Sequence, residues 1–285
     1  RRLELRGMGS LTAEKHSNSK NPKIKQKRLG PKRAKTKLKS KKKRRDKNEA
    51  ELIQNIQSSH ENNEEAYPAS AAKRQLCFFL DQFQSANGVQ LSSLELESIK
   101  DTSIVELSQD ATQDVQNLGK HMKAAFGSPW KEALCGKQEG KVDPGCPALL
   151  IVSSSALRSI ELLRGFRSLT KDCHAVKLFS KHMKVEEQVS LLKSRVNIAC
   201  GTPSRVKKLI DIEALGLSRL AVILLDIHPD VKGYSLFTLP QVRDEFWDLY
   251  KCYFHPRLLQ GNLRICLYGP LQSVTELKGR KRGSS

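Results

Sequence analysis

Five short apolar runs, separated by segments of helical periodicity, constrain the fold of this chain more than any other feature. The runs occupy residues 148–152, 175–179, 196–200, 220–225 and 263–268, and three of them contain one polar residue each: Lys177, Asn197 and Arg264. Continuous apolar runs of this length are typical of strands that are buried on both faces. The segments between them carry apolar residues every three or four positions, which indicates helices. Strands and helices that alternate in this way predict an α/β fold with a single parallel sheet covered by helices on both faces.

The net charge of +20 is concentrated at the two ends of the sequence. Residues 1–47 hold 20 Lys and Arg against three acids, and residues 278–285 hold four against none. Residues 48–277 are close to neutral, with 26 Lys and Arg against 27 acids. The sequence therefore predicts a folded lobe at residues 73–277, between a basic arm and a short basic tail.

The basic arm lacks the apolar surface that folding requires. From Lys20 to Lys47 there are 16 Lys and Arg, one acid and four apolar residues. Such a segment cannot offset its ordering entropy, and its like charges repel one another. We therefore expect residues 1–72, the arm and an acidic linker, to be disordered when free.

One basic run within the arm predicts contact with nucleic acid. It consists of Lys41, Lys42, Lys43, Arg44 and Arg45. Clusters of Lys and Arg attract phosphates without reading sequence, and they also serve as nuclear and nucleolar targeting signals. A merely solvated tail is the alternative interpretation.

The first part of the lobe, residues 73–147, is expected to be partly helical. Apolar residues recur at helical spacing from Leu76 to Phe83, and residues 114–125 also favour a helix. Residues 91–107 show no clear period. Near the end of the lobe, residues 242–254 favour a helix whose aromatic residues are expected to pack in the core, with partner binding as the alternative.

Several kinds of site are not expected from this sequence. There is no stretch of about 18 consecutive apolar residues, so we expect no membrane span. The seven cysteines show no C-x-x-C spacing, which predicts neither a zinc site nor a disulfide framework. Scattered free thiols fit a reducing compartment. We expect no metal and no cofactor.

The residues that follow the predicted strands resemble motifs of DEAD-box RNA helicases. The string GTPSRV at residues 201–206 is similar to the helicase GTPGR motif, with serine where the second glycine is usual. The string LLDIHP at residues 224–229 stands in the place of the DEAD box, and only Asp226 matches it. SSSAL at residues 153–157 replaces the PTREL motif, and YGP at residues 268–270 replaces SAT. The resemblance implies a degenerate form of the first RecA-like helicase lobe, which has a P-loop NTPase fold.

The same comparison indicates that the catalytic groups are lost. ATP hydrolysis requires a Gly-rich loop with Lys and Ser or Thr, and no G-x-x-x-x-G-K-[ST] string is present. Ile227 stands where the catalytic Glu of the DEAD box is usual. The sequence ends soon after the fifth predicted strand, so we expect no second helicase lobe. We expect a pseudoenzyme, and we expect Asp226 to be structural, because a lone carboxylate holds magnesium poorly.

The basic arm, GTPSRV and the string LLDIHPD together resemble the Cms family of ribosomal-small-subunit proteins. The resemblance covers residues 20–275. It implies a nucleolar factor of ribosome biogenesis and rRNA processing that has no catalytic activity. It also implies two kinds of partner: RNA, expected to be pre-rRNA, and proteins of the small-subunit pre-ribosome.

The helicase resemblance also implies RNA-binding residues within the lobe. Gly201, Thr202 and Arg205 correspond to helicase residues that touch the RNA backbone. Ser153 and Ser154 follow the first strand and are further candidates. The alternative is structural, with Thr202 as a helix cap and the serines as a strand-to-helix turn.

Two other functions stay open from the sequence. One is an RNA-stimulated ATPase whose phosphate loop departs from the usual string. The other is a protein that binds DNA or chromatin through the arm alone, because a basic arm does not distinguish DNA from RNA.

Overall fold

The computed structural model describes residues 69–271, with gaps at 109, 136–143, 168 and 171–172. The described residues belong to one compact unit. The predictions for residues 1–68, including the basic run at 41–45, and for the basic tail lie outside the described residues. At the end of the predicted linker, residues 71–72 already belong to a helix, because Ser70 caps its start. Within the described part, none of the helices has the length and apolar character needed to cross a bilayer.

A single five-stranded parallel sheet forms the centre of the lobe. Its strands are β1 (Leu149–Val152), β2 (Ala175–Leu178), β3 (Ile198–Gly201), β4 (Val222–Asp226) and β5 (Arg264–Tyr268). They lie in the order β2-β3-β1-β4-β5, and all neighbouring strands are parallel. Each strand overlaps one of the five apolar runs, so the predicted α/β fold class is confirmed.

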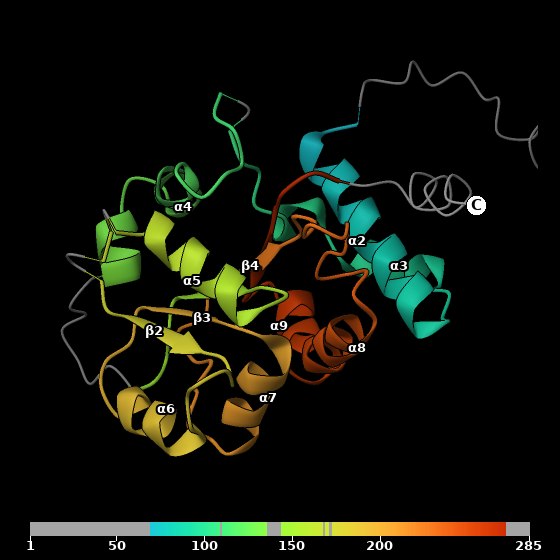
Figure 1. The fold of residues 1–285 in the computed structure, drawn as a ribbon. Coiled ribbons are helices and arrows are strands. Elements are labelled where there is room, and N and C mark those ends of the chain that lie inside the picture. Colours follow the sequence, from blue (N-terminus) through green and yellow to red (C-terminus); the bar gives the residue numbers. More distant parts are fainter. Residues whose placement is uncertain (1–68, 109, 136–143, 168, 171–172, 272–285) are drawn as a thin grey trace, which may run out of the picture. The chain divides into compact units, whose positions relative to one another are not determined.

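Helices cover both faces of the sheet (Figure 1). One face carries α4 (Leu118–Phe126), α5 (Ala156–Gly165) and the short helix η2 (Lys131–Cys135). The opposite face carries α2 (Ala71–Asn87), α6 (Val185–Leu192), α7 (Pro203–Asp211) and α8 (Pro240–Leu249), and α8 continues through η3 (Tyr250–Phe254) into α9 (His255–Leu259). Two short elements, α3 (Ser93–Ser98) and η1 (Asp101–Ser103), follow α2.

Alternate side chains of each strand enter two separate apolar cores. In β1, Leu150 and Val152 belong to the core under α2, α7 and α8, whereas Leu149 and Ile151 belong to the core under α4 and α5. All four residues of β1 are buried. This double burial explains why the central strands β1 and β4 are nearly continuous apolar runs, whereas the edge strand β2 includes the exposed Lys177.

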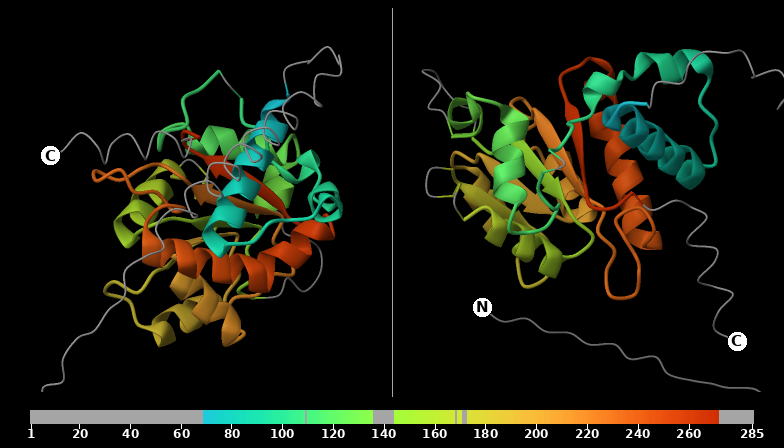
Figure 2. Two further views of the ribbon diagram at one scale, coloured as in Figure 1. Left: turned by 90° about the vertical axis from the view of Figure 1, so that its right-hand side faces the viewer. Right: turned by 90° about the horizontal axis from the view of Figure 1, so that it is seen from above.

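The helix α2 packs against α8, although the two are far apart in the sequence (Figure 2). Phe79 and Phe83 of α2 meet Trp247 and Tyr250 with ring centroids 5.2–5.6 Å apart. Aromatic pairs at this spacing add to the energy of burial. The prediction that the aromatic residues near the end of the lobe pack in the core is therefore confirmed.

A short segment before α4 extends the sheet beyond β5. Ile104 forms an isolated parallel bridge with Ile265, and the N–H of Val105 donates to the Ile265 carbonyl at 2.8 Å. The sequence shows no strand pattern here because the paired stretch is too short to display a period. The bridge directs the chain to the carboxyl edge of the sheet, where residues 106–117 lead into α4.

The expectation that all the cysteines are free is wrong for one pair. Cys135, at the end of η2, and Cys173, just before β2, form a disulfide with their Cα atoms 4.9 Å apart. The two residues are 38 positions apart in the sequence, and only the packing of η2 near the start of β2 brings them together. The other described cysteines are Cys77, Cys146, Cys200, Cys252 and Cys266, and these are free.

Candidate functional site at the carboxyl edge of the sheet

The carboxyl ends of β1 and β4 are where this architecture favours a binding site. In open α/β sheets, ligands bind beyond neighbouring strands that lead to opposite faces of the sheet. The strands β1 and β4 are such a pair, because β1 leads into α5 on one face and β4 leads to α8 on the other. The site therefore lies between the turn at residues 153–155 and the loop after Asp226.

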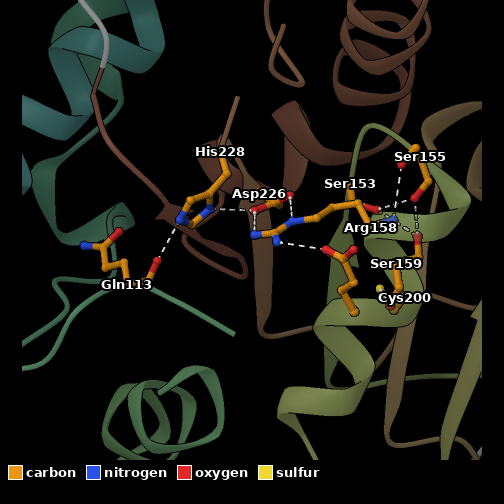
Figure 3. Close-up of polar contacts among 9 residues, drawn as sticks. Gln113, Ser153, Ser155, Arg158, Ser159, Cys200, Asp226 and His228 are labelled. Atoms are coloured by element: carbon orange, nitrogen blue, oxygen red, sulfur yellow. Dashed lines mark hydrogen bonds and ion pairs between the residues drawn. The ribbon is translucent and has the colours of Figure 1, made fainter. Parts of the chain in front are cut away.

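Asp226, the last residue of β4, is held by Arg158 from the first turn of α5 (Figure 3). Its carboxylate is 1% exposed and accepts from Nε of Arg158 at 2.8 Å and from Nη2 at 3.0 Å. A third guanidinium nitrogen, Nη1, donates to Glu161 at 3.2 Å. The hydrogen bond to Asp226 is the main cause that raises the pKa of Arg158 above its ordinary value. The guanidinium thus neutralises the buried acid.

His228 links the same carboxylate to the loop before α4. Its Nδ1 lies 2.8 Å from Oδ1 of Asp226, and its Nε2 lies 2.6 Å from the carbonyl oxygen of Gln113 (Figure 3). The ring also packs at 5.7 Å from that of Tyr268. Three segments that are distant in the sequence therefore meet at Asp226.

The loop before α4 is fastened to the end of β5 as well. The side chain of Gln113 accepts from the N–H of Gly269 at 2.8 Å, and the Tyr268 hydroxyl donates to the Asp114 carbonyl at 2.7 Å. Burial raises the pKa of Tyr268, which keeps the hydroxyl protonated as a donor. The Asp114 carboxylate accepts two backbone N–H groups just before α4, both at 2.9 Å. The Asp114 carboxylate thus occupies backbone N–H groups of the kind that bind anions at the N-termini of other helices.

The serine turn after β1, residues 153–155, makes hydrogen bonds that mainly stabilise the start of α5. Ser155 is the N-cap of α5, and its hydroxyl accepts from the N–H of Arg158 at 3.2 Å, which confirms the predicted turn. Ser153 is fully buried, and its hydroxyl lies 2.7 Å from that of Ser159 (Figure 3). Ser154 is partly exposed and lines the pocket described below.

The other candidate RNA-binding residues lie together at the carboxyl end of β3. Gly201 is required by packing, because a Cβ there would lie 2.0 Å from the Leu178 carbonyl oxygen. Thr202 is the N-cap residue of α7, but its side chain makes no capping hydrogen bond. Arg205 donates to the side chain of Gln188 on α6 at 2.7 Å. Their contact with RNA stays a prediction.

Exposed lysines surround this end of β3. Lys181 and Lys184 lie in the connection from β2 to α6, and Lys208 lies on α7 one turn after Arg205. Among the described residues, none of these three lysines forms an ion pair. The two glutamates in the first turn of α6 are the acids that oppose this positive charge.

A pocket of about 440 Å³ opens between the serine turn and the loop after β4. Its lining consists of Ser154, Ser155, Leu157, Arg158, Glu161, His228, Pro229, Asp230 and Val231. The part of the chain that the structure describes contains no group of three or more His, Cys, Asp or Glu residues arranged to hold a metal ion. Burial raises the pKa of Cys200, which lies under the serine turn, so this thiol stays protonated.

Sequence reasoning missed the roles of Arg158, His228 and Gln113. The helical pattern places Arg158 in the first turn after a strand and therefore at the carboxyl edge of the sheet. Its partner depends on β1 and β4 being neighbours, and no local pattern in the sequence reveals that strand order.

A family model described as "CMS1: U3-containing 90S pre-ribosomal complex subunit" matches residues 12–268. The chain is 39% identical over 120 residues to "Protein CMSS1" of Homo sapiens, a match that covers 41% of this chain and 40% of the relative. It is 38% identical over 159 residues to "Protein CMS1" of Chaetomium thermophilum, covering 52% and 60%. The match to "Protein CMSS1" of Danio rerio is 29% over 200 residues, covering 66% and 69%. The chain thus spans about two fifths of the human relative.

Two of the similar solved structures are DEAD-box proteins. A DEAD box protein from Methanococcus jannaschii is 18% identical with a TM-score of 0.37, covering 78% of this chain and 54% of that one. The yeast splicing factor Prp28 is 15% identical with a TM-score of 0.36, covering 51% and 33%. The match of the family model extends over most of the sequence, from before the lobe to the end of β5. The chain belongs to the CMS1 family of U3-containing 90S pre-ribosomal complex subunits.

Proposed function

We propose that this chain is a non-enzymatic factor of ribosome biogenesis that acts in the nucleolus with the small-subunit pre-ribosome. Its lobe and basic arm bind RNA, expected to be pre-rRNA, and its lobe also binds pre-ribosomal proteins. The description of the family, which names a U3-containing 90S pre-ribosomal complex, supports this assembly.

The non-enzymatic part of the proposal rests on the contacts of the Asp226 carboxylate. In nucleotide hydrolases an acid at this kind of position holds the magnesium ion that bridges the phosphates. Here Arg158 and His228 already engage both carboxylate oxygens. The next residue, Ile227, is buried and has no group that polarises water. Magnesium binding would require the acid to give up its ion pair.

The RNA-binding part rests on the end of β3 and on the arm. The backbone amides at the start of α7 and the hydroxyl of Thr202 favour a phosphate group there, and the three exposed lysines add positive charge. Ser153 supports the turn after β1 from inside, and Ser154 lies on the β1 side of the neighbouring pocket, so the proposed RNA surface is centred on β3 and α7. The arm run at residues 41–45 strengthens binding without adding sequence specificity.

Crosslinking of the full chain in cells tests the proposal directly. We expect crosslinks to rRNA precursors, whereas crosslinks to genomic DNA would favour the chromatin-binding alternative. Deletion of residues 20–47 is expected to abolish nucleolar retention and to lower the affinity for RNA. Unchanged localisation of the deletion variant would contradict the proposal.

A pair of charge reversals tests whether the lobe itself binds RNA. The double variant Lys181→Glu/Lys208→Glu of the full chain is expected to bind single-stranded RNA several-fold more weakly in a filter assay, because two phosphate contacts become repulsive. Lys100→Glu/Lys193→Glu, at exposed lysines elsewhere on the lobe, is the matched control. Equal losses in the two double variants would show that only net charge matters and that the end of β3 is not a binding surface.

A further inference from the structure

The pocket between β1 and β4 has features that RNA binding at the end of β3 does not use. Its volume of about 440 Å³ is within the range of ligand pockets. It lies at the point of the sheet where neighbouring strands lead to opposite faces, which is the usual place for a ligand in this architecture. Neither the lysines around β3 nor Thr202 contribute to its lining.

Two large apolar side chains stand exposed at this pocket. Leu157 of α5 is 63% exposed, and Val231 in the loop after β4 is fully exposed. Single exposed apolar residues are common on protein surfaces, but apolar groups gathered at a cavity mark an interaction site. The pair thus offers apolar contact to a partner on both sides of the pocket.

The turn that presents Val231 is closed by hydrogen bonds and is therefore prepared for binding. The N–H of Asp230 donates to the Tyr234 carbonyl at 2.7 Å. The Asp230 carboxylate accepts from the backbone N–H groups of Lys232 and Tyr234, both at 2.8 Å. A partner that contacts Val231 does not have to order this turn, which lowers the entropic cost of binding.

The charge of the pocket excludes phosphate and favours a cation. Glu161 and Asp230 line the pocket, and Asp226 lies beneath it. Against these three carboxylates stand the Arg158 guanidinium, which is already paired with Asp226 and Glu161, and the His228 ring, which lies 2.8 Å from Asp226. A triphosphate or an RNA backbone would meet net repulsion here, whereas a Lys or Arg side chain would be attracted.

We propose that this pocket binds a protein segment that presents a Lys or Arg side chain next to apolar residues. The cation enters between Glu161 and Asp230, and the apolar neighbours pack against Leu157 and Val231. The inference rests on the proposed function only in that the lobe has protein partners. RNA binding at the end of β3 neither requires nor excludes it.

A synthetic dodecapeptide that alternates Lys and Leu is the first probe, titrated by fluorescence anisotropy into the purified full chain. Glu161→Gln is expected to weaken its binding by about two- to fivefold, the usual effect of one exposed charge pair. Leu157→Gln/Val231→Ser is expected to weaken it at least as much, because the apolar contact is lost. All three positions are exposed or partly exposed, and thermal unfolding verifies that each variant folds.

Matched controls are available on α6. Glu186→Gln removes an exposed acid and Leu191→Gln an exposed apolar residue, and neither residue lines the pocket. If these control substitutions weaken peptide binding as much as the pocket substitutions do, binding is non-specific and the proposal is wrong.

A photoreactive amino acid at position 231 of the full chain, used in cells, identifies the natural occupant. We expect a crosslink that resists nuclease and maps to a protein segment with Lys or Arg beside apolar residues, and Glu161→Lys should abolish it. A nuclease-sensitive crosslink, an acidic segment, or a yield no higher than from the same probe at position 191 would overturn the inference. Deletion of residues 20–47 tests the RNA proposal separately, so the two failures are distinguishable.

Discussion

At the residue scale, Asp226 shows how an acid can be retained while its role changes. A carboxylate at the end of a buried strand is desolvated and needs partners. The Arg158 guanidinium supplies a two-pronged, charge-assisted contact, and His228 supplies a third. The acid therefore joins α5 and the loop before α4 to the sheet, which is a structural role.

The dependence of Asp226 on Arg158 gives the first prediction. Arg158→Met should lower the free energy of unfolding by about 3–5 kcal/mol, because it leaves a buried carboxylate without its cation. Arg158→Met/Asp226→Leu should recover most of this loss. Urea unfolding followed by circular dichroism measures both variants. If Arg158→Met alone is as stable as the parent chain, Asp226 does not need the ion pair.

His255 predicts a pH dependence of stability. Burial lowers the pKa of His255 below its usual 6.5, and the charge of Glu95 opposes this to a smaller extent. The Tyr250 hydroxyl lies 2.9 Å from Nδ1, and the Phe83 ring stacks on the imidazole. Because the unfolded chain binds the proton more readily, the free energy of unfolding should fall as the pH drops below 6.5 and level off below the folded pKa.

Urea unfolding between about pH 8 and pH 5 measures this effect. In His255→Gln the free energy of unfolding should vary less over this range than in the parent chain. His182→Gln, at an exposed histidine, is the control and should keep the parent's dependence. If the free energy of unfolding of His255→Gln varies with pH as strongly as that of the parent chain, the prediction is wrong.

At the scale of elements, β3 and α7 are fixed by close backbone packing. The last residue of β3 is a glycine because β2 leaves no room for a side chain. The helix α7 then begins with Pro203 at its first turn, a residue that is preorganised for this position. The GTPSRV string is thus explained in part by packing, whether or not it also meets RNA.

Gly201→Ala tests this packing. The added Cβ would lie 2.0 Å from the Leu178 carbonyl oxygen, so the two strands must separate. We expect a loss of about 1–3 kcal/mol or more in the free energy of unfolding, as for other overpacked sites. Ser204→Ala, at an exposed position three residues along, should change stability little. Equal stability of both variants would mean that β2 and β3 adapt freely.

At the scale of the whole molecule, the distribution of charge separates two modes of binding. The near-neutral lobe provides shaped surfaces, whereas the arm provides charge with few apolar groups and no Phe, Trp or Tyr. Contacts of the lobe are therefore expected to set specificity, and those of the arm to set affinity and its salt dependence.

The salt dependence of RNA binding gives a prediction for the arm. If about eight arm charges meet single-stranded phosphates, deletion of residues 20–47 should reduce the slope of log K against log salt by about 6. Titrations of the full chain and of the deletion variant at several salt concentrations measure it. A slope unaffected by the deletion would place the phosphate contacts on the lobe.

Nucleotide binding gives a prediction for the lobe. Saturating ATP with magnesium should leave the midpoint of thermal unfolding of the full chain unchanged, because a ligand stabilises a protein only when it binds the folded state. The physical reason is that Asp226 is paired and that Asp114 already occupies the amides before α4. A clear rise in the midpoint that is lost in Asp226→Ala would support the ATPase alternative.

Much of the fold was predictable because its signals are local. The strands at residues 149–152 and 222–226 are buried on both faces, so their apolar runs stand out from polar surroundings. Ser155 and Pro203 mark the starts of their helices for local reasons of capping and backbone angle. The edge segment at residues 104–105 was not predictable, since one bridge leaves no period.

The sequence by itself determined the parallel sheet, its helices and the charged arm, because burial and periodicity act over a few residues. Only the tertiary structure decided which polar groups meet. Arg158 and Asp226 are 68 positions apart, and Gln113 and His228 are 115 apart. Cys135 and Cys173 also pair across the fold. Such contacts follow from strand order and helix placement, which depend on the packing of the whole lobe, so no local pattern encodes them.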